Sequence, residues 1–236
     1  MAARLPGVQA RYLEIKRRIG EACGRSGRSP EEIVLVAASK TQPASTLAAA
    51  WQAGLRVFGE NRVQEAIAKS RDLSSPPYGI EWHLIGPLQS NKVKPALDLF
   101  RVIQSVDRLS IAEALDQEAG RRGCRLSGLL EINLGEEGSK HGFAPEGLAE
   151  AVRPLAELEH LKIVGLMAIP PQQEAPEASR PWFRRLRELR DELGSRSEWR
   201  GFPGWLSMGM SHDFEVAVEE GATHVRVGTS LFGQRP

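Results

Sequence analysis

The sequence has 236 residues, and its 31 Lys and Arg against 30 Asp and Glu give a formal net charge of +1. This balance argues against an electrostatic nucleic-acid binder, which carries a basic surplus or stripe. The two cysteines, Cys23 and Cys124, lack the spacing of a zinc site or a disulfide framework. No segment has the pattern of a signal peptide or membrane span, so we expect a cytoplasmic monomer with no membrane or nucleic-acid partner.

Residues about 8–24 have the pattern of a leading amphipathic helix, and a short valine-rich run follows at 33–38. Such a run is typical of a buried strand. Lys40 comes next, in the turn beyond the strand. A lysine fixed at a partly dry strand tip can become neutral and nucleophilic toward a carbonyl. The alternative is a solvated lysine that ends the strand.

Short apolar segments then alternate with polar-faced helical segments, which favours parallel βα units. The predicted strands are 33–38, 56–59, 81–85, 102–105, 128–133, 163–167, 204–207 and 224–227. The predicted helices after the first are 44–53, 61–71, 91–99, 108–122, 145–157, 177–193 and 211–220. This pattern predicts an α/β fold, one (β/α)₈ TIM-type barrel domain over residues 1–236 with an extra N-terminal helix. A doubly wound open sheet is the main alternative, but the sequence has no glycine-rich dinucleotide turn.

Functional residues of such barrels lie at the C-terminal ends of the strands, and a common phosphate site follows strands seven and eight. Here those two loops contain Ser207, Gly209, Ser211, Gly228, Thr229 and Ser230. Glycines let backbone N–H groups approach a phosphate, and hydroxyl groups add donors. The alternative is that these residues only make tight turns.

Arg226 shares one face of its strand with His224, whereas Val225 and Val227 occupy the other face. If the first face points into the barrel, Arg226 is a buried cation that needs a partner. That partner is either a structural carboxylate or the ring nitrogen of a bound ligand. His83, in the middle of the third strand, is either a core residue or a group that supports a ligand.

A neutral lysine after strand one, a phosphate cup after strands seven and eight, and an arginine in strand eight would share one rim. This combination suits a phosphorylated cofactor that carries an aldehyde. We therefore predict pyridoxal 5′-phosphate (PLP), held as a Schiff base by Lys40.

Segments 38–43, 58–65, 82–92, 165–170, 206–211 and 225–233 resemble the pyridoxal phosphate homeostasis protein family, in the family's order. The resemblance implies a barrel like the alanine racemase N-terminal domain and Lys40 as the Schiff-base lysine. It also implies that Arg226 faces the pyridine nitrogen. Departures are small: His212 stands where an acidic residue is more common, and Arg62 where an aromatic is common. The predicted cofactor-binding residues are Lys40, Asn61, His83, Met167, Ser207, Gly209, Arg226, Gly228 and Thr229.

Two classes of function remain, a small amino-acid racemase and a non-enzymatic carrier that delivers PLP to apo forms of PLP-dependent enzymes. Two-base racemisation needs a proton acceptor on each face of the cofactor. The resemblance implies that related racemases take the second base, a tyrosine, from a C-terminal β domain. We expect no such domain here, since the chain ends at Pro236 and its only tyrosines are Tyr12 and Tyr78. An arginine at the ring nitrogen also keeps the ring a weak electron sink. We therefore predict the carrier. Lys140 is a candidate second amine that receives the departing aldehyde, and the alternative is that it is a solvated loop lysine.

Overall fold

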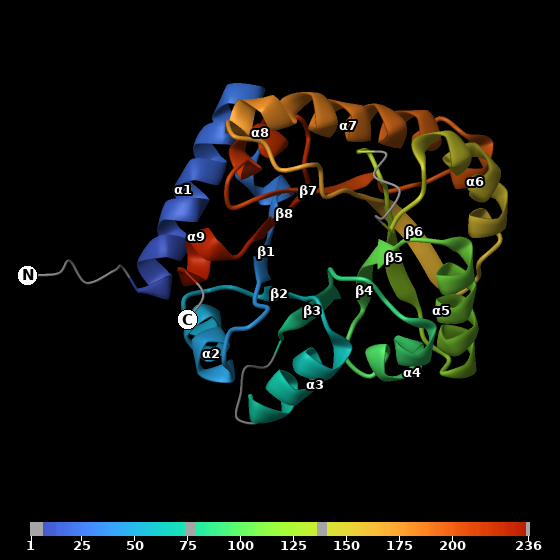
Figure 1. Ribbon diagram of the computed structural model, residues 1–236, viewed down its shortest axis with the longest axis horizontal. Helices are drawn as coiled ribbons and strands as arrows, with labels where there is room; N and C mark the ends of the chain where they lie inside the picture. Colours follow the sequence, from blue (N-terminus) through green and yellow to red (C-terminus); the bar gives the residue numbers. More distant parts are fainter. Residues whose placement is uncertain (1–6, 74–78, 136–140, 235–236) are drawn as a thin grey trace, which may run out of the picture.

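Eight parallel strands form a closed barrel whose order follows the sequence (Figure 1). The computed structural model describes residues 7–73, 79–135 and 141–234. The strands are β1 (Val34–Ala38), β2 (Val57–Glu60), β3 (Glu81–Leu84), β4 (Val102–Val106), β5 (Leu126–Glu131), β6 (Leu161–Met167), β7 (Trp205–Met210) and β8 (His224–Val227). Parallel pairing of β1 with β8 closes the ring. The prediction of a (β/α)₈ barrel is confirmed.

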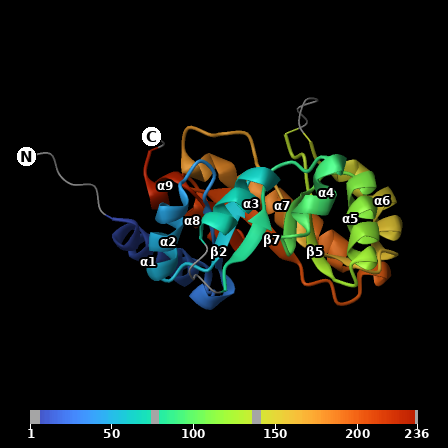
Figure 2. The ribbon, with the colours of Figure 1, turned by 90° about the horizontal axis from the view of Figure 1, so that it is seen from below.

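Helices surround the strands on the outside of the barrel (Figures 1 and 2). They are α1 (Val8–Ser26), α2 (Ala44–Gln52), α3 (Val63–Asp72), α4 (Val93–Ala96), α5 (Leu109–Arg121), α6 (Leu148–Ala156), α7 (Arg180–Gly194), α8 (Phe214–Glu219) and α9 (Thr229–Phe232). Short 3₁₀ turns lie at Pro30–Glu32, Ser90–Lys92, Pro145–Gly147, Pro176–Ser179 and Ser197–Trp199. Helix α9 was not predicted, because four residues are too few to show helical periodicity in the sequence. Within the described ranges, none of these helices is long and apolar enough to cross a bilayer.

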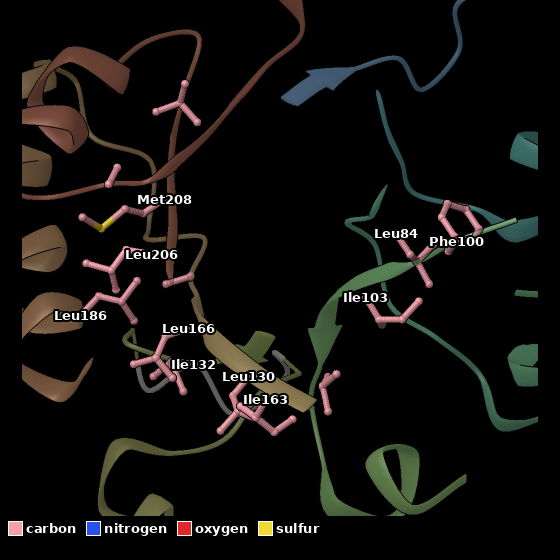
Figure 3. Close-up of a cluster of buried hydrophobic side chains, with 14 of the residues drawn as sticks. Leu84, Phe100, Ile103, Leu130, Ile132, Ile163, Leu166, Leu186, Leu206 and Met208 are labelled. Carbon is pink, nitrogen blue, oxygen red and sulfur yellow. The ribbon is translucent and has the colours of Figure 1, made fainter. Parts of the chain in front are cut away.

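The main hydrophobic core lies between the strands and the surrounding helices. Alternate strand residues point outward, and Leu206 and Met208 of β7 lie beside Leu186 of α7 in this layer (Figure 3). These three side chains are fully buried. Burying one such side chain contributes about 1.5–3 kcal/mol, so this layer is the largest stabilising contribution to the barrel.

The barrel interior has an apolar part and a polar part. Val102, Leu129, Val164 and Met167 form a separate apolar cluster on the side of β4 to β6. The remaining interior positions include buried polar side chains on β3, β4, β7 and β8: His83, Gln104, Ser207, His224 and Arg226. Because a buried polar group without a partner is costly, these side chains must be paired with one another or with a ligand.

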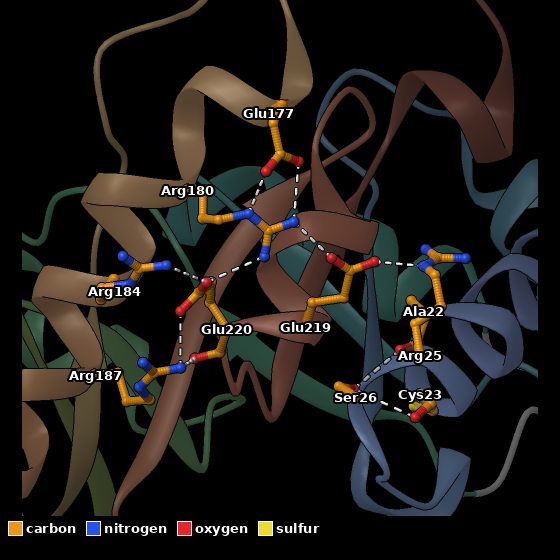
Figure 4. A network of polar contacts seen from close by, with 10 residues as sticks. All are labelled: Ala22, Cys23, Arg25, Ser26, Glu177, Arg180, Arg184, Arg187, Glu219 and Glu220. Atoms are coloured by element: carbon orange, nitrogen blue, oxygen red, sulfur yellow. Dashed lines mark hydrogen bonds and ion pairs between the residues drawn. The ribbon is translucent and has the colours of Figure 1, made fainter.

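Helix α1 packs outside the barrel against α8, α9 and α2. Ile15, Ile19 and Cys23 form its buried face. An ion-pair network continues from α1 to α7 (Figure 4): Glu219 of α8 accepts from Arg25 at 2.6 Å and from Arg180 at 2.6 Å. The added N-terminal helix is therefore joined to the helices next to it on the barrel by both apolar and charged contacts.

Candidate functional site

A cavity of about 390 Å³ opens at the C-terminal ends of the strands. It is lined by several of the predicted cofactor-binding residues: Lys40, Asn61, Arg226, Gly228 and Thr229. They come from the loops after β1, β2 and β8 and from β8 itself. The closed order of the strands, with β1 between β8 and β2, brings these distant segments together.

Lys40 lies two residues beyond β1 and is partly buried. The residue before it, Ser39, is fully buried, and the residue after it, Thr41, has a left-handed φ of 66°. A threonine in this region is strained by about 1–3 kcal/mol, and such strain persists only where surrounding contacts impose it. Here the Thr41 N–H donates to Glu65 Oε1 at 2.8 Å. The turn that presents Lys40 is therefore held by contacts outside it.

Asn61 reaches the cavity because Gly86 allows a close approach between two loops. A Cβ atom at Gly86 would lie 2.6 Å from the Asn61 carbonyl oxygen and 2.7 Å from its Cα. Asn61 also lines a neighbouring cavity of about 520 Å³, together with Arg62 and Lys92. The family-variable Arg62 thus lies next to the Lys40 cavity rather than in it.

Arg226 is a buried cation that faces the cavity, with 4% of its surface exposed. Its Nη2 donates to the Ala168 carbonyl at 2.8 Å and its Nη1 to Ser207 Oγ at 2.6 Å. In the described part of the chain, no carboxylate forms an ion pair with it. Burial lowers the pKa of Arg226 to about 10, and Glu131 and Asp213 counteract this only at longer range. Of the two predicted partners, a structural carboxylate is not found among the described residues.

A hydrogen-bonded chain crosses the barrel interior and ends at Arg226. Ser207 Oγ donates to Gln104 Oε1 at 2.7 Å, and Gln104 Nε2 lies 2.8 Å from His83 Nδ1. His83 Nε2 then lies 2.9 Å from Glu81 Oε1, at the opposite mouth of the barrel. His83 and Ser207 were predicted to bind the cofactor, but both lie inside the barrel and not in the wall of the cavity. Their contact with a ligand stays a prediction, and the geometry favours an indirect effect through Arg226.

Met167 and Gly209 are also absent from the cavity wall. Met167 is fully buried in the apolar interior cluster. Gly209 has a φ of 86°, and a Cβ there would lie 2.4 Å from Cβ of Ala217 on α8. The register of β7 against β8 shifts at this point, between Ser207 and Met210. Gly209 therefore allows the end of β7 to bend close to α8, which is a structural reason for glycine.

The corner after β7 and β8 contains backbone donors that converge. The N–H groups of Gly228 and Ser230 point at one atom, Ser211 Oγ, at 3.3 and 3.1 Å. Asp213 supports this loop, since its Oδ1 accepts from the Met210 N–H at 2.8 Å. Ser211 lines the cavity and was not among the predicted binding residues, although its loop was. Its place just beyond the end of β7 was the signal that could have identified it.

The outer wall of the cavity is apolar. Only three large hydrophobic side chains in the described ranges are exposed, and two of them, Ile169 (44%) and Met210 (38%), line this cavity. Pro170 and Pro171 continue the wall after β6. His212, at the other family-variable position, is an exposed part of the lining. Exposed apolar side chains gathered at a polar site are typical of a ligand-binding mouth.

Two other sequence-based expectations concern residues 78 and 140. Tyr78 and Lys140 lie outside the described residues, as does most of the loop that contains Lys140. Metal binding has no support in the part of the chain that the structure describes, where no cluster of His, Cys, Asp and Glu has the required arrangement.

Comparison with known proteins identifies the family. The family described as "Alanine racemase, N-terminal domain" matches residues 18–236. A relative from Aquifex aeolicus named pyridoxal phosphate homeostasis protein is 46% identical, over 95% of this chain and 97% of its own. The chain belongs to the pyridoxal phosphate homeostasis protein family.

Solved structures extend this family assignment. The structure of PipY from Synechococcus elongatus with PLP bound has a TM-score of 0.81 and 40% identity, over 91% of this chain and 100% of PipY. An alanine racemase from Clostridium difficile shares the fold at 14% identity, with a TM-score of 0.69. This chain covers 98% of its own length in that alignment but 58% of the racemase. The homeostasis family therefore shares its barrel with a larger group of proteins.

Proposed function

We propose that this protein binds PLP as a Schiff base with Lys40 and acts as a non-enzymatic carrier that buffers PLP and delivers it to apo-enzymes. The observation that carries the proposal is that Lys40, Gly228, Thr229 and Arg226, a cation with no ion-pair partner among the described residues, line one cavity. The names of the relatives and the PLP-bound structure of PipY support the same cofactor.

The donor groups of the cavity fit the chemistry of PLP. Arg226 offers a buried charge with no direct carboxylate partner among the described residues, which suits an acceptor nitrogen on an aromatic ring. The Ser211 hydroxyl, whose oxygen accepts from the Gly228 and Ser230 N–H groups, offers a donor for a phosphate. Ile169 and Met210 offer apolar surface for the ring. We assign these residues to the three parts of the cofactor on that basis.

When bound, PLP supplies an aldehyde that condenses with an amine and releases water. Lys40 would provide that amine, which attacks the aldehyde carbon in its neutral form. Arg226 would only donate to the ring nitrogen, because with a pKa of about 10 its guanidinium stays protonated at neutral pH. A ring nitrogen that receives no proton withdraws electrons weakly, which favours holding the cofactor over catalysing with it.

The second candidate, an amino-acid racemase, has less support. Two-base racemisation needs a proton acceptor on each face of the cofactor. Tyr12 lies on α1 and lines a different cavity, beside Gly54 and Leu55. None of the described tyrosines therefore lies where it could take a proton at the Lys40 cavity. The arginine at the proposed ring-nitrogen position also disfavours the carbanion chemistry that racemisation requires.

Borohydride trapping tests the binding mode. Purified protein loaded with PLP should be yellow, and reduction should fix the cofactor to the peptide that contains Lys40. Lys40→Ala should abolish the Schiff-base absorbance, whereas Lys94→Ala, which removes an exposed lysine of α4, should retain it. An adduct on another peptide, with full absorbance in Lys40→Ala, would contradict the assignment.

Cofactor transfer tests the carrier role. Loaded protein mixed with a PLP-free aminotransferase should restore that enzyme's activity, while alanine racemisation stays negligible. Lys140→Ala should slow the transfer without abolishing PLP binding, as the sequence predicts. Racemisation at about 1 per second or faster would support the enzyme instead.

A further inference from the structure

Lys69, on the helix that follows β2, is a buried lysine outside the cavity. It is 7% exposed and donates three hydrogen bonds, to the Ser39 carbonyl at 2.8 Å, to Glu60 Oε1 at 2.8 Å and to Glu65 Oε1 at 2.7 Å. Buried lysines are rare and need partners. Through these partners Lys69 is connected to the residues on both sides of Lys40, Ser39 and Thr41.

The same network holds the residue before Lys40 and the residue after it. The Ser39 carbonyl accepts from Lys69, and the Ser39 hydroxyl donates to Glu60 Oε1 at 2.6 Å. The Thr41 N–H donates to Glu65 Oε1, the oxygen that also accepts from Lys69. The Lys69 ammonium group therefore fixes the backbone on both sides of Lys40. It bonds directly to the Ser39 carbonyl, 30 residues away in the sequence, and it bonds to the Glu65 carboxylate that holds the Thr41 N–H.

Charge makes Lys69 the centre of this network. Burial raises the pKa of Glu60, whose Oε2 has no hydrogen-bond partner among the described residues. Burial also acts to raise the pKa of Glu65, but hydrogen bonds from Lys69 and the Thr41 N–H outweigh it and lower the pKa. Arg62 acts on Glu65 only at longer range. Without the ammonium group, two neighbouring acids would face each other with no cation bonded to them, and Glu65 would move toward solvent.

Movement of Glu65 would release Thr41. The left-handed φ of Thr41 is the strained part of the turn, and the hydrogen bond to Glu65 holds its N–H. A relaxed Thr41 would turn the preceding peptide, and with it the direction in which Lys40 leaves the backbone. Reactions that depend on the orientation of a nucleophile are sensitive to displacements of this size.

We propose that Lys69 and Glu65 are positioning residues that hold Lys40 in the orientation for PLP binding and thereby set how slowly the bound cofactor is released. The inference rests on the proposed function, because it assumes that Lys40 binds the cofactor. Lys69 and Glu65 would act on the bound cofactor without touching it, since neither residue lines the cavity.

The test compares Glu65→Ala, Glu65→Gln, Lys69→Met and Lys69→Arg with two control variants, Lys94→Met and Glu113→Gln, at exposed positions on α4 and α5. For each loaded protein we would measure the rate of PLP release to an excess of apo-enzyme and the pH titration of the Schiff-base absorbance. Thermal unfolding of the apo form would report the structural effect separately.

Glu65→Ala and Lys69→Met should release PLP about tenfold faster or more, with a shifted titration midpoint. Glu65→Gln should recover part of the loss, because its amide oxygen can still accept from the Thr41 N–H. The control variants should match the wild type. If Lys69→Met does not fold, Glu65→Ala decides the question, since its side chain is 29% exposed.

Release rates and titration midpoints within twofold of wild type, in a folded Glu65→Ala, would overturn the inference. Borohydride separates this outcome from failure of the proposed function. Trapping at Lys40 in the wild type with no change in the variants overturns the positioning role alone. No trapping at Lys40 in the wild type overturns both.

Discussion

Arg226 Nη1 donates a hydrogen bond to Ser207 Oγ at 2.6 Å, inside the barrel and below the cavity. The Ser207 hydroxyl donates its own hydrogen bond to Gln104 Oε1. The Ser207 hydroxyl therefore has no hydrogen left to donate to a ligand. Its oxygen accepts from Arg226 and so orients the arginine that faces the cavity. The sequence predicts that Ser207 binds the phosphate, whereas from this contact we propose that Ser207 acts through Arg226 at the ring nitrogen.

Ser211→Ala and Ser207→Ala should consequently weaken binding in different ways. A hydrogen bond to a charged group contributes about 1.5–3 kcal/mol, so Ser211→Ala should weaken PLP binding roughly tenfold or more. It should leave the binding of pyridoxal, which has no phosphate, unchanged. Ser207→Ala should weaken both ligands by a similar factor. Absorbance titrations of the two variants with both ligands measure this; a loss confined to PLP in Ser207→Ala would restore the original assignment.

Arg226→Met should separate stability from binding. Burial lowers the pKa of Arg226 from its usual range to about 10, which corresponds to a cost of about 3 kcal/mol for the buried charge. Its two hydrogen bonds come from a charged donor and return about 1.5–3 kcal/mol each, which offsets this cost, and methionine has a similar length. We therefore expect Arg226→Met to lower the unfolding free energy of the apo protein by no more than about 3 kcal/mol, while PLP binding weakens at least tenfold.

Urea unfolding of the apo form and a PLP titration measure these two effects. Arg226→Lys serves as the control, because it keeps the charge without the planar guanidinium. A large loss of stability in Arg226→Met would show that the arginine is a structural residue rather than one kept for the cofactor.

His224 should make the protein less stable in acid. Burial, followed by His83 and Arg226, lowers the pKa of His224 to about 3, and Glu81 opposes this. A lowered pKa means that the folded state resists protonation, so its contribution is present above about pH 6.5 and is lost as the pH falls toward 3. The loss amounts to about 1.4 kcal/mol per pH unit for one proton. Between pH 7 and pH 4.5, His224→Gln should lose less unfolding free energy than the wild type. Urea unfolding of both proteins at these two pH values measures the difference. Equal losses would place the acid sensitivity elsewhere.

Gly86→Ala should disturb the cavity through Asn61. The new Cβ would lie 2.6 Å from the Asn61 carbonyl oxygen, too close without a backbone shift. Such overpacking costs about 1–3 kcal/mol, shared between stability and PLP binding. Gly147→Ala is the matched control, because a Cβ there meets nothing within 4 Å. Thermal unfolding and a PLP titration of both variants measure the difference, and identical behaviour would remove the structural reason for glycine at 86.

The sequence by itself determined the barrel and the place of Lys40. The alternation of short apolar runs with amphipathic segments specifies parallel βα units, because burial on both faces of a strand and one face of a helix leaves different periods in the sequence. The same alternation separated His224 and Arg226 from Val225 and Val227, and the valines are indeed in the outer core. Each of these features is local, so the short segment that forms it contains the pattern that predicts it.

Tertiary structure alone decided which side chains meet. The sequence could place Ser207 and Ser211 in one loop but could not tell which faces the cavity, because a one-residue shift in the pairing of β7 with β8 changes the direction of the strand end. Lys69 and Glu65 gave no functional signal, since on α3 they form an ordinary i, i+4 pair. Their contacts with Ser39 and Thr41 span 30 and 24 residues. These contacts form only when the closed barrel places β1 beside β2 and α3. No local pattern in the sequence predicts that the side chains of Lys69 and Glu65 lie close to Ser39 and Thr41.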